Sequence, residues 1–299
     1  MINALKLAAI FLGVPVVLSG VLVFAFTDNK TLQIEHIIID KRKNDSSKDS
    51  IDNTESNERN FKIVHLSDIH LPQCRVDFIQ MSKFMQEFQP DMIALTGDVV
   101  HNGNTKISEC GLQSFLKSIK KVAPIYFVTG NHETVSVQNS DIIKMLEDSG
   151  VTILDNKVAI VNKLNCNDIA VKVYGLKDNT KYEKNLFDYS NLSEQKSNQI
   201  INTSANILLA HRPELHSSYT QTNELDLVLC GHAHGGQVRI FGRGLFAPGQ
   251  GVFPKLSGGN YNKGKFKNTN MIVARGMGNS RFPWRINNKP HMVFITLEL

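Results

Sequence analysis

Five short apolar runs in this chain each end at a polar residue, and this repeated pattern constrains the fold more than any other feature. Phe61–Leu66 leads to Asp68, and Leu225–Leu229 leads to His232. The other three are Met92–Leu95 before Asp98, Ile125–Val128 before Asn131 and Ile207–Leu209 before His211. Such runs are typical of buried strands, and polar groups gather outside the carboxyl ends of strands in α/β sheets. We therefore expect the five polar segments to meet at one edge of a sheet.

Strand patterns alternate with helical patterns over the first part of this region, which predicts a layered α/β domain. Phe78, Met81, Met85 and Phe88, for example, recur at the spacing of one buried helical face. Strands are expected at Leu32–Ile37, Phe61–Leu66, Met92–Thr96, Ile125–Thr129, Ile169–Tyr174, Asn206–Ala210, Leu225–Cys230, Val238–Phe241, Met271–Ala274 and Met292–Leu297. Helices are expected at Val76–Phe88, Ser108–Val122, Ser140–Asp148 and Pro213–Tyr219.

The segment Leu7–Phe26 contains 20 residues and no charge. A helix of this length spans about 30 Å, the thickness of the hydrocarbon core of a bilayer. A cleaved signal peptide is the alternative, but the run is longer than the usual apolar region of a signal, and no Ala-x-Ala site follows it. We expect a membrane anchor over residues 1–30, a strand and a flexible polar spacer over 31–60, and the main domain over 61–299.

The charges around the apolar segment bear on its orientation in the cell membrane. Lys6 lies on one side, whereas Lys30, Lys41, Arg42 and Lys43 lie on the other. The positive-inside rule therefore favours a single-pass protein with the main domain in the cytoplasm. A single Lys before an apolar run is also how an export signal begins, so both orientations stay open.

Overall charge and cysteine usage exclude other classes. The net charge is +5, and the basic residues do not cluster in the sequence, so no nucleic-acid partner is expected. The four cysteines form no CxxC pair and have no metal-ligand spacing. We expect free, mostly buried thiols, with Cys230 as a spectator beside the polar edge.

The polar segments carry the ligand types of a dinuclear metal site. The candidate ligands are Asp68, His70, Asp98, Asn131, His211, His232 and His234. They offer carboxylate oxygen, amide oxygen and imidazole nitrogen, a mixture that suits Mn, Fe or Zn better than Ca or Mg. Manganese is our first expectation. Two cations about 3.5–4 Å apart can share a carboxylate and a hydroxide, and Asp98 is the expected bridge.

Single members of this set are weak signals, because Asp-x-His and His-x-His occur on many loops. The alternative, that they are capping or core polar residues, is difficult to sustain for all five segments in order. It holds for His65, which alternates with apolar neighbours and is expected to pack inside a strand.

The ordered set D-x-H, G-D, G-N-H-E, H and G-H-x-H resembles the calcineurin-like metallophosphoesterase superfamily, from about Phe61 to the end of the chain. Gly235-Gly236-Gln237 and the segments Gly276–Ser280 and Pro283–Arg285 resemble its membrane-anchored bacterial branch. That branch includes phosphodiesterases and UDP-2,3-diacylglucosamine pyrophosphohydrolases. The resemblance implies a four-layer α-β-β-α sandwich with the site at one end.

The resemblance also implies roles for individual residues. Asp68, His70, Asp98 and His234 would hold one metal ion, and Asp98, Asn131, His211 and His232 would hold the other. Asn131 and His132 would be catalytic, with His132 protonating the leaving oxygen or binding phosphate. In the phosphoprotein phosphatases of the superfamily an Asp three residues after the bridging Asp orients that histidine. This chain has His101 there.

The expected activity is hydrolysis of a phosphodiester or pyrophosphate bond, with a lipid-linked substrate as one option. The alternative is a membrane-tethered scaffold that binds metal without turnover. Arg212 and Arg285 are candidates for a second phosphate contact, because guanidinium matches phosphate, or they are structural ion pairs. The loop aromatics line an acyl pocket or pack their loops; they are Phe241, Phe246, Phe253 and Phe282.

Overall fold

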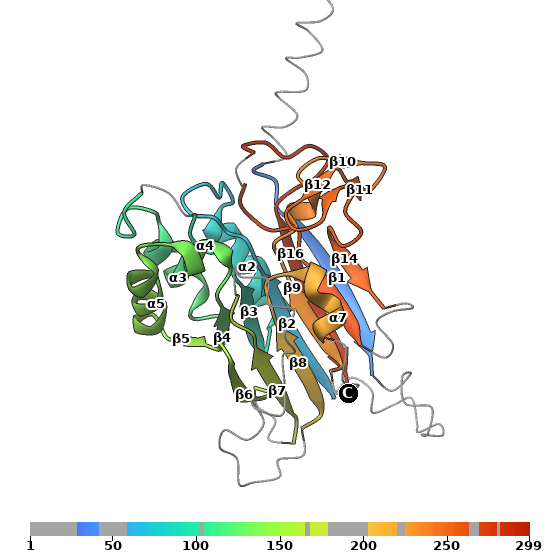
Figure 1. Cartoon of the computed structure of the whole chain (residues 1–299). Helices are drawn as coiled ribbons and strands as arrows, with labels where there is room; N and C mark the ends of the chain where they lie inside the picture. The colour runs from blue at the N-terminus through green and yellow to red at the C-terminus, as the bar shows by residue number, and fades with distance from the viewer. Residues whose placement is uncertain are drawn as a thin grey trace, which may run out of the picture.

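Two six-stranded sheets lie face to face in the computed structural model of the chain (Figure 1). It describes residues 29–41, 59–101, 105–164, 168–178, 203–219, 225–262, 269–279 and 282–299. The first sheet has the order β1 (Gln33–Asp40), β16 (His291–Glu298), β2 (Asn60–Leu66), β3 (Met92–Thr96), β4 (Ile125–Val128) and β5 (Val151–Ile153). The second has the order β14 (Gly259–Tyr261), β15 (Asn270–Val273), β9 (Leu227–Cys230), β8 (Ala205–Leu209), β7 (Ala170–Gly175) and β6 (Lys157–Asn162).

Parallel pairing at the centre of both sheets sets the position of the polar segments. Strands β2, β3, β4 and β5 are parallel neighbours, as are β7, β8, β9 and β15. Strand β16 runs antiparallel to β2 and parallel to β1. Ile295 of β16 is therefore opposite both Ile63 and Ile37, and all three side chains lie in the core between the sheets.

Alternate residues of the first sheet face two different cores. Met92 and Ala94 of β3 point toward the second sheet, whereas Ile93 and Leu95 pack under helices. The helices that cover this outer face are α2 (Phe78–Phe88), α3 (Leu112–Ile119) and α5 (Asn139–Asp148). A parallel sheet covered on both faces needs strands that are apolar throughout. The apolar segments that form these strands are therefore easy to recognise in the sequence.

The outer face of the second sheet carries a thinner cover. The 3₁₀ turn η2 (Pro213–Leu215) and the short helix α7 (His216–Tyr219) pack there, with Tyr219 buried. Two small hairpins follow, β10 (Arg239–Ile240) with β11 (Arg243–Gly244), and β12 (Phe246–Ala247) with β13 (Gly251–Val252). The expected mixed α/β fold is confirmed. In the described part of the chain the fourth layer consists of these short elements.

Most predicted elements are present, with boundaries moved by local capping. Helix α2 begins at Phe78 rather than Val76, because the side chain of Asp77 caps it by accepting from the backbone N–H of Ile79 at 2.9 Å. Helix α3 begins only after Gly111, whose φ of 89° is left-handed, so the predicted start at Ser108 is wrong. The predicted strand Val238–Phe241 shrinks to β10. Strands β5, β6 and β14 and the five-residue helix α4 (Asn131–Val135) were not predicted.

The predicted anchor Leu7–Phe26 and most of the polar spacer lie outside the described residues. Within the described ranges, no helix is both long and apolar enough to cross a membrane. Strand β1, which was expected to precede the main domain, is a full member of the first sheet.

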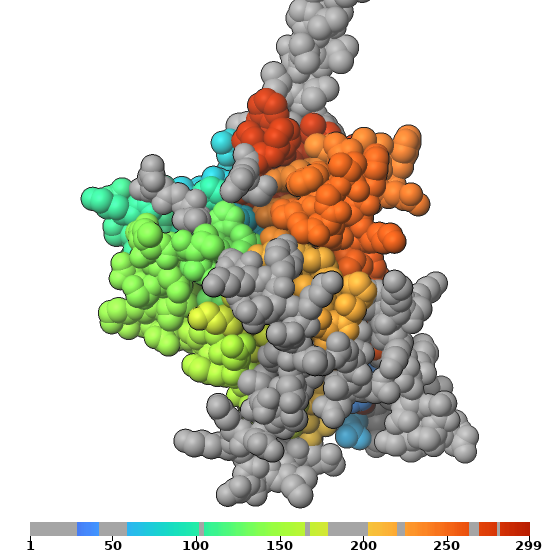
Figure 2. All heavy atoms as spheres, viewed as in Figure 1, coloured from blue at the N-terminus to red at the C-terminus, as the bar shows by residue number. Residues whose placement is uncertain are grey.

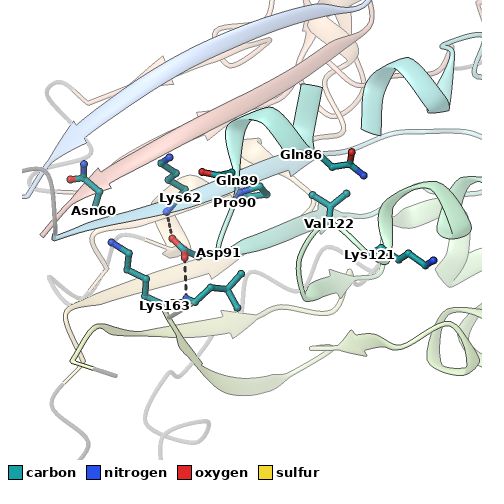
Figure 3. A pocket seen from close by; sticks show the side chains of 10 residues that line it. Asn60, Lys62, Gln86, Gln89, Pro90, Asp91, Lys121, Val122 and Lys163 are labelled. Carbon is teal, nitrogen blue, oxygen red and sulfur yellow. Dashed lines mark hydrogen bonds between the residues drawn. The ribbon is translucent and has the colours of Figure 1, made fainter. Parts of the chain in front are cut away.

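A cavity of about 630 Å³ opens at the amino ends of β2 and β3 (Figure 3). Asp91 lies in its wall, and its carboxylate accepts from the backbone N–H groups of Lys62 at 2.8 Å and Leu164 at 3.1 Å. This carboxylate joins the turn between β6 and β7 to the first sheet. The polar segments follow the carboxyl ends of β2 and β3, so the cavity lies at the other end of these strands.

Candidate metal centre

The five polar segments come together at the carboxyl ends of strands from both sheets. Asp68, Asp98 and Asn131 follow β2, β3 and β4 of the first sheet, whereas His211 and His232 follow β8 and β9 of the second. The prediction that they share one edge of one sheet is therefore wrong in this respect. The apolar runs alone could not show that the strands divide into two facing sheets.

One group of candidate ligands contains Asp68, His70 and His234, whose ligand atoms all lie within 4.8 Å of one another. His70 Nε2 is 3.1 Å from His234 Nε2, and His234 Nε2 is 3.3 Å from Asp68 Oδ1. All three residues are buried. Two imidazole nitrogens and a carboxylate oxygen thus face a common point.

A second group contains Asp98, His211 and His232, again within 4.8 Å. His211 Nε2 is 3.3 Å from Asp98 Oδ2 and 3.2 Å from His232 Nδ1. The amide oxygen of Asn131 lies 3.1 Å from the same His211 nitrogen. The structure therefore brings the predicted Asn131 to this second group.

Asp98 connects the two groups. Its Oδ2 is 3.7 Å from His70 Nε2 in the first group and 3.3 Å from His211 Nε2 in the second. The backbone N–H of His132 donates to Oδ1 at 2.8 Å, which fixes the orientation of the carboxylate. A carboxylate held in this way can contact two cations at once.

The backbone of the site is strained. Five of the seven candidate ligands have left-handed φ angles: Asp68 at 50°, His70 at 50°, Asp98 at 54°, His232 at 65° and His234 at 49°. For residues with a Cβ this conformation costs about 1–2 kcal/mol each, so it persists only where the surroundings enforce it. Gly231 allows the close approach, because a Cβ there would overlap Ser67 Oγ and Asp68 Oδ2.

In the absence of metal, Asp98 and His211 shift each other's pKa values. Burial alone would raise the pKa of Asp98, but the neighbouring His211 and His70 outweigh it and hold the pKa well below its ordinary value. Burial works against protonation of His211, yet Asp98 and then Asp68 raise the pKa of His211 to about 10. His211 is therefore protonated, and its positive charge lies beside the carboxylates that would otherwise bind a cation.

The imidazoles of the other three histidine ligands have lowered pKa values, which favour the neutral form. Burial first, and neighbouring positive groups next, lower the pKa of His234 to about 3 and hold the pKa values of His70 and His232 well below 6.5. Neutral imidazole is the form that ligates metals. His234 Nδ1 is also buried without a hydrogen-bond partner. The nitrogen that faces the ligand group is Nε2, and the donor set of carboxylate, amide and neutral imidazole groups fits divalent metal ions.

His211 is oriented for such a role by the backbone. Its Nδ1 lies 2.7 Å from the carbonyl oxygen of Thr96, which accepts the Nδ1–H and leaves Nε2 directed at Asp98 and Asn131. Histidine ligands are commonly held by a carbonyl in this way.

Sequence reasoning gave no role to the acidic residues around the ligands. Glu133, fourth in the G-N-H-E segment, is fully buried and accepts from the backbone N–H of Asp98 at 2.8 Å. Asp178 pairs with Arg212 through Nε at 2.6 Å and Nη2 at 3.2 Å. Arg212 Nη1 in turn lies 3.2 Å from His232 Nε2. Glu133 sits inside a recognised motif and could have been found, whereas Asp178 has no local signal.

His132 lies at the opening of the site. Its side chain is 18% exposed, compared with 0–6% for His70, His211, His232 and His234. His101 packs beside it with ring centroids 4.9 Å apart, and also lies close to His70, with 3.4 Å between their Nδ1 atoms. An imidazole therefore occupies the place where the resemblance implied a carboxylate.

The other residues considered in the sequence analysis make contacts that stabilise the fold. Arg285 is fully buried, and its guanidinium donates to the backbone carbonyls of Arg275 and Gly278, so the structural alternative is supported there. Arg212 is an ion pair, as described above. His65 is buried in β2 with Nε2 2.8 Å from Thr96 Oγ1, as predicted. The three described cysteines are free, and Cys166 lies outside the described residues.

Comparison with known proteins agrees with this geometry. A family model described as calcineurin-like phosphoesterase matches residues 61–236, more than half of the chain. The chain belongs to this family. It is accordingly a metal-dependent phosphoesterase, and members of the family typically bind two divalent metal ions.

Similar proteins occur in bacteria. "Uncharacterized metallophosphoesterase YkuE" of Bacillus subtilis is 27% identical over 246 residues, which cover 80% of this chain and 79% of the relative. "Uncharacterized protein YpbG" of the same organism is 24% identical over 79% of this chain and 80% of its own length. "Phosphodiesterase YaeI" of Escherichia coli is 26% identical over 79% of this chain and 82% of its own.

Proposed function

We propose that the chain hydrolyses a phosphodiester or pyrophosphate bond with two divalent metal ions, manganese being the first candidate. Asp68, His70, Asp98 and His234 would hold one ion, and Asp98, Asn131, His211 and His232 would hold the other. The observation that carries the proposal is the contact of two Asp/His groups through a single carboxylate, that of Asp98. When bound, two such ions lower the pKa of water and neutralise phosphoryl oxygens.

The side chains around the ligands then have distinct tasks. His132, the accessible imidazole, donates a proton to the leaving oxygen, and His101 packs against its ring. Asn131 supplies a neutral oxygen, so the site keeps its positive charge toward an anionic phosphate. The 3.2 Å contact of Arg212 with His232 and its pairing with Asp178 support a role in holding that histidine rather than the substrate.

The substrate class follows from the site and a relative. A phosphodiesterase among the similar proteins supports a diester or a pyrophosphate. We further propose that the substrate is lipid-linked, with UDP-2,3-diacylglucosamine as one candidate, and that Leu7–Phe26 anchors the chain in the cell membrane. The flanking Lys and Arg residues support a cytoplasmic catalytic domain.

The test is hydrolysis of bis-p-nitrophenyl phosphate by the detergent-solubilised full chain, stripped of metal and then titrated with Mn²⁺. We expect turnover only with metal, and loss of turnover in Asp98→Ala. Asp148→Ala, at an exposed position of α5, is the matched control and should keep full activity. Activity that survives Asp98→Ala would refute the assigned site.

Metal binding without hydrolysis of any ester would instead favour the scaffold alternative. Calorimetric titration of Mn²⁺ into the same stripped protein separates the two results. A scaffold gives binding heat and no product, whereas the proposed enzyme gives both.

A further inference from the structure

The end of the molecule beyond the candidate site exposes an unusual number of large apolar side chains. We define the hairpin face by six of them: Phe241, Phe246, Val252, Phe253, Phe282 and Trp284. Phe241 is 100% exposed, Val252 is 65% exposed and Phe253 is 64% exposed. Phe241 therefore adds nothing to the packing of the described chain. Concentrated apolar exposure of this kind marks an interaction surface.

Backbone pairing joins the segments that carry these six residues. Phe246 and Val252 are cross-strand partners in the β12–β13 hairpin, and the backbone N–H of Phe253 donates to the carbonyl of Leu245 at 2.8 Å. The backbone N–H of Arg239 in β10 donates to Ile286 at 3.0 Å, which ties the first hairpin to the Trp284 segment. The hairpins (orange) and this segment (red) cover the same end of the molecule in Figures 1 and 2.

The start of the described chain is fixed to this surface. Asn29 Oδ1 accepts from the backbone N–H of Arg285 at 3.1 Å, and its Nδ2 lies 3.3 Å from the carbonyl oxygen of Pro283. Only two residues separate the end of the uncharged run Leu7–Phe26 from Asn29. A membrane that takes up this uncharged run would therefore lie next to the hairpin face.

The sequence that forms the hairpin face carries basic residues and no acidic ones. No Asp or Glu occurs between Asp226 and Glu298, whereas exposed Arg243 and Lys255 flank the hairpin aromatics. Aromatic rings with adjacent Lys and Arg are the composition of segments at the headgroup level of a bilayer. Each such cation adds to the attraction toward an anionic lipid surface.

We propose that the hairpin face lies against an anionic phospholipid bilayer, with its aromatic side chains at the boundary between headgroups and acyl chains. His234 precedes β10 closely, and Asn288 Nδ2 donates to the His234 carbonyl at 2.8 Å. The candidate ligand His234 is therefore linked to both the first hairpin and the Trp284 segment. This surface is separate from the proposed hydrolysis and does not depend on turnover.

The chain contains a built-in reporter, because Trp284 is its single tryptophan. The full chain is reconstituted into vesicles of phosphatidylcholine and phosphatidylglycerol, with or without bromine on the acyl chains. We expect loss of Trp284 emission in the brominated vesicles and protection from aqueous iodide. Unchanged emission with full iodide access overturns the proposal.

Moving the tryptophan to other positions shows whether lipid contact extends over the whole hairpin face or only around Asn29. Trp284→Phe with Phe241→Trp places it on the β10–β11 turn, and bromine quenching should persist. Trp284→Phe with Leu164→Trp places it at the 46%-exposed turn beside the cavity of Figure 3, at the other end of the strands, and should not be quenched.

Two results contradict the proposal in these variants. Quenching confined to wild-type Trp284 would limit lipid contact to the vicinity of Asn29. Protection from iodide that grows with protein concentration, without bromine quenching, would assign the hairpin face to a second copy of this chain. Neither result affects the assigned metal centre, which the phosphodiester assay tests alone.

Discussion

The buried carboxylate of Glu133 accepts a hydrogen bond from the backbone N–H of Asp98 at 2.8 Å. It also accepts from the backbone N–H groups of Gly130 at 2.9 Å and Val100 at 3.1 Å. One side chain thus connects the turn after β3 with the start of α4. This connection holds the loop that presents Asp98 to both ligand groups.

Replacing this acceptor should weaken the metal centre. Glu133→Gln keeps the shape but supplies one acceptor oxygen for three N–H donors, so the Asp98 loop loses its fixed position. We expect Mn²⁺ affinity, measured by calorimetry on stripped protein, to fall about 10–100-fold. Glu147→Gln, exposed on α5, is the control. Unchanged affinity in Glu133→Gln would contradict this role.

Metal removal should lower the thermal stability. The left-handed conformations of Asp68, Asp98 and His234 cost free energy that metal coordination offsets. Saturation at a hundred times the dissociation constant adds about 2.7 kcal/mol, which corresponds to a rise in Tm of roughly 5–10 °C. Scanning fluorimetry with Mn²⁺ and with Ca²⁺ tests this. Ca²⁺ should give the smaller shift, since imidazole suits it poorly.

The pair Asp178–Arg212 is buried, so removing one partner should be costly. Asp178→Ala leaves the Arg212 charge without its bidentate acceptor and should lower the free energy of unfolding by about 3–5 kcal/mol in urea titrations of metal-free protein. The double variant Asp178→Leu with Arg212→Met removes both charges and should recover much of the loss. An equal loss in the double variant would show that the pairing itself is not what stabilises this region.

Two buried histidines outside the ligand set should make stability depend on pH. Burial, and then the charge of His291, lower the pKa of His65 from 6.5 to about 3. Burial likewise lowers the pKa of His291 to about 4, against the raising effect of Glu35. Between these values and pH 6.5 the unfolded chain binds protons that the folded chain does not. The free energy of unfolding therefore falls as the pH is lowered through this window.

The contribution of His65 can be isolated. Its slope is about 1.4 kcal/mol per pH unit, and His65→Gln should remove it from urea titrations between pH 4 and 6.5 of metal-free protein. Thr96→Val removes the hydroxyl partner and keeps the imidazole, so it should lower stability at every pH without flattening the profile. A profile unchanged by His65→Gln would assign the effect to other groups.

Local patterns in the sequence predict most of the fold. Met92–Thr96 forms a strand with the predicted bounds, because a parallel strand buried on both faces is apolar throughout. Strand β5 is missed because three residues, Val151–Ile153, with one exposed in the middle, carry too short a pattern. Strands β11, β12 and β13 are missed, and β10 is shorter than predicted, because the turns of these hairpins depend on glycines and Val238 pairs with the distant Ile286.

The ligand groups are predictable for a related reason, since each motif follows its own strand directly. Contacts between distant single residues are not. Asp178 meets Arg212 just beyond the carboxyl ends of the neighbouring strands β7 and β8, and Glu35 meets His291 from 256 positions away at 2.9 Å. No local pattern marks either acid. Only the pairing of the strands, which sequence periodicity leaves undetermined, brings these partners together.

The place of β16 between β1 and β2 has a consequence for biosynthesis. Synthesis proceeds from the amino end, so β1 and β2 leave the ribosome long before residues 291–298, which pair with both. The first sheet closes only after nearly all of this chain has been translated. Until then the edge of β2 that will receive β16 stays open to other strands, which is the period of greatest risk for aggregation.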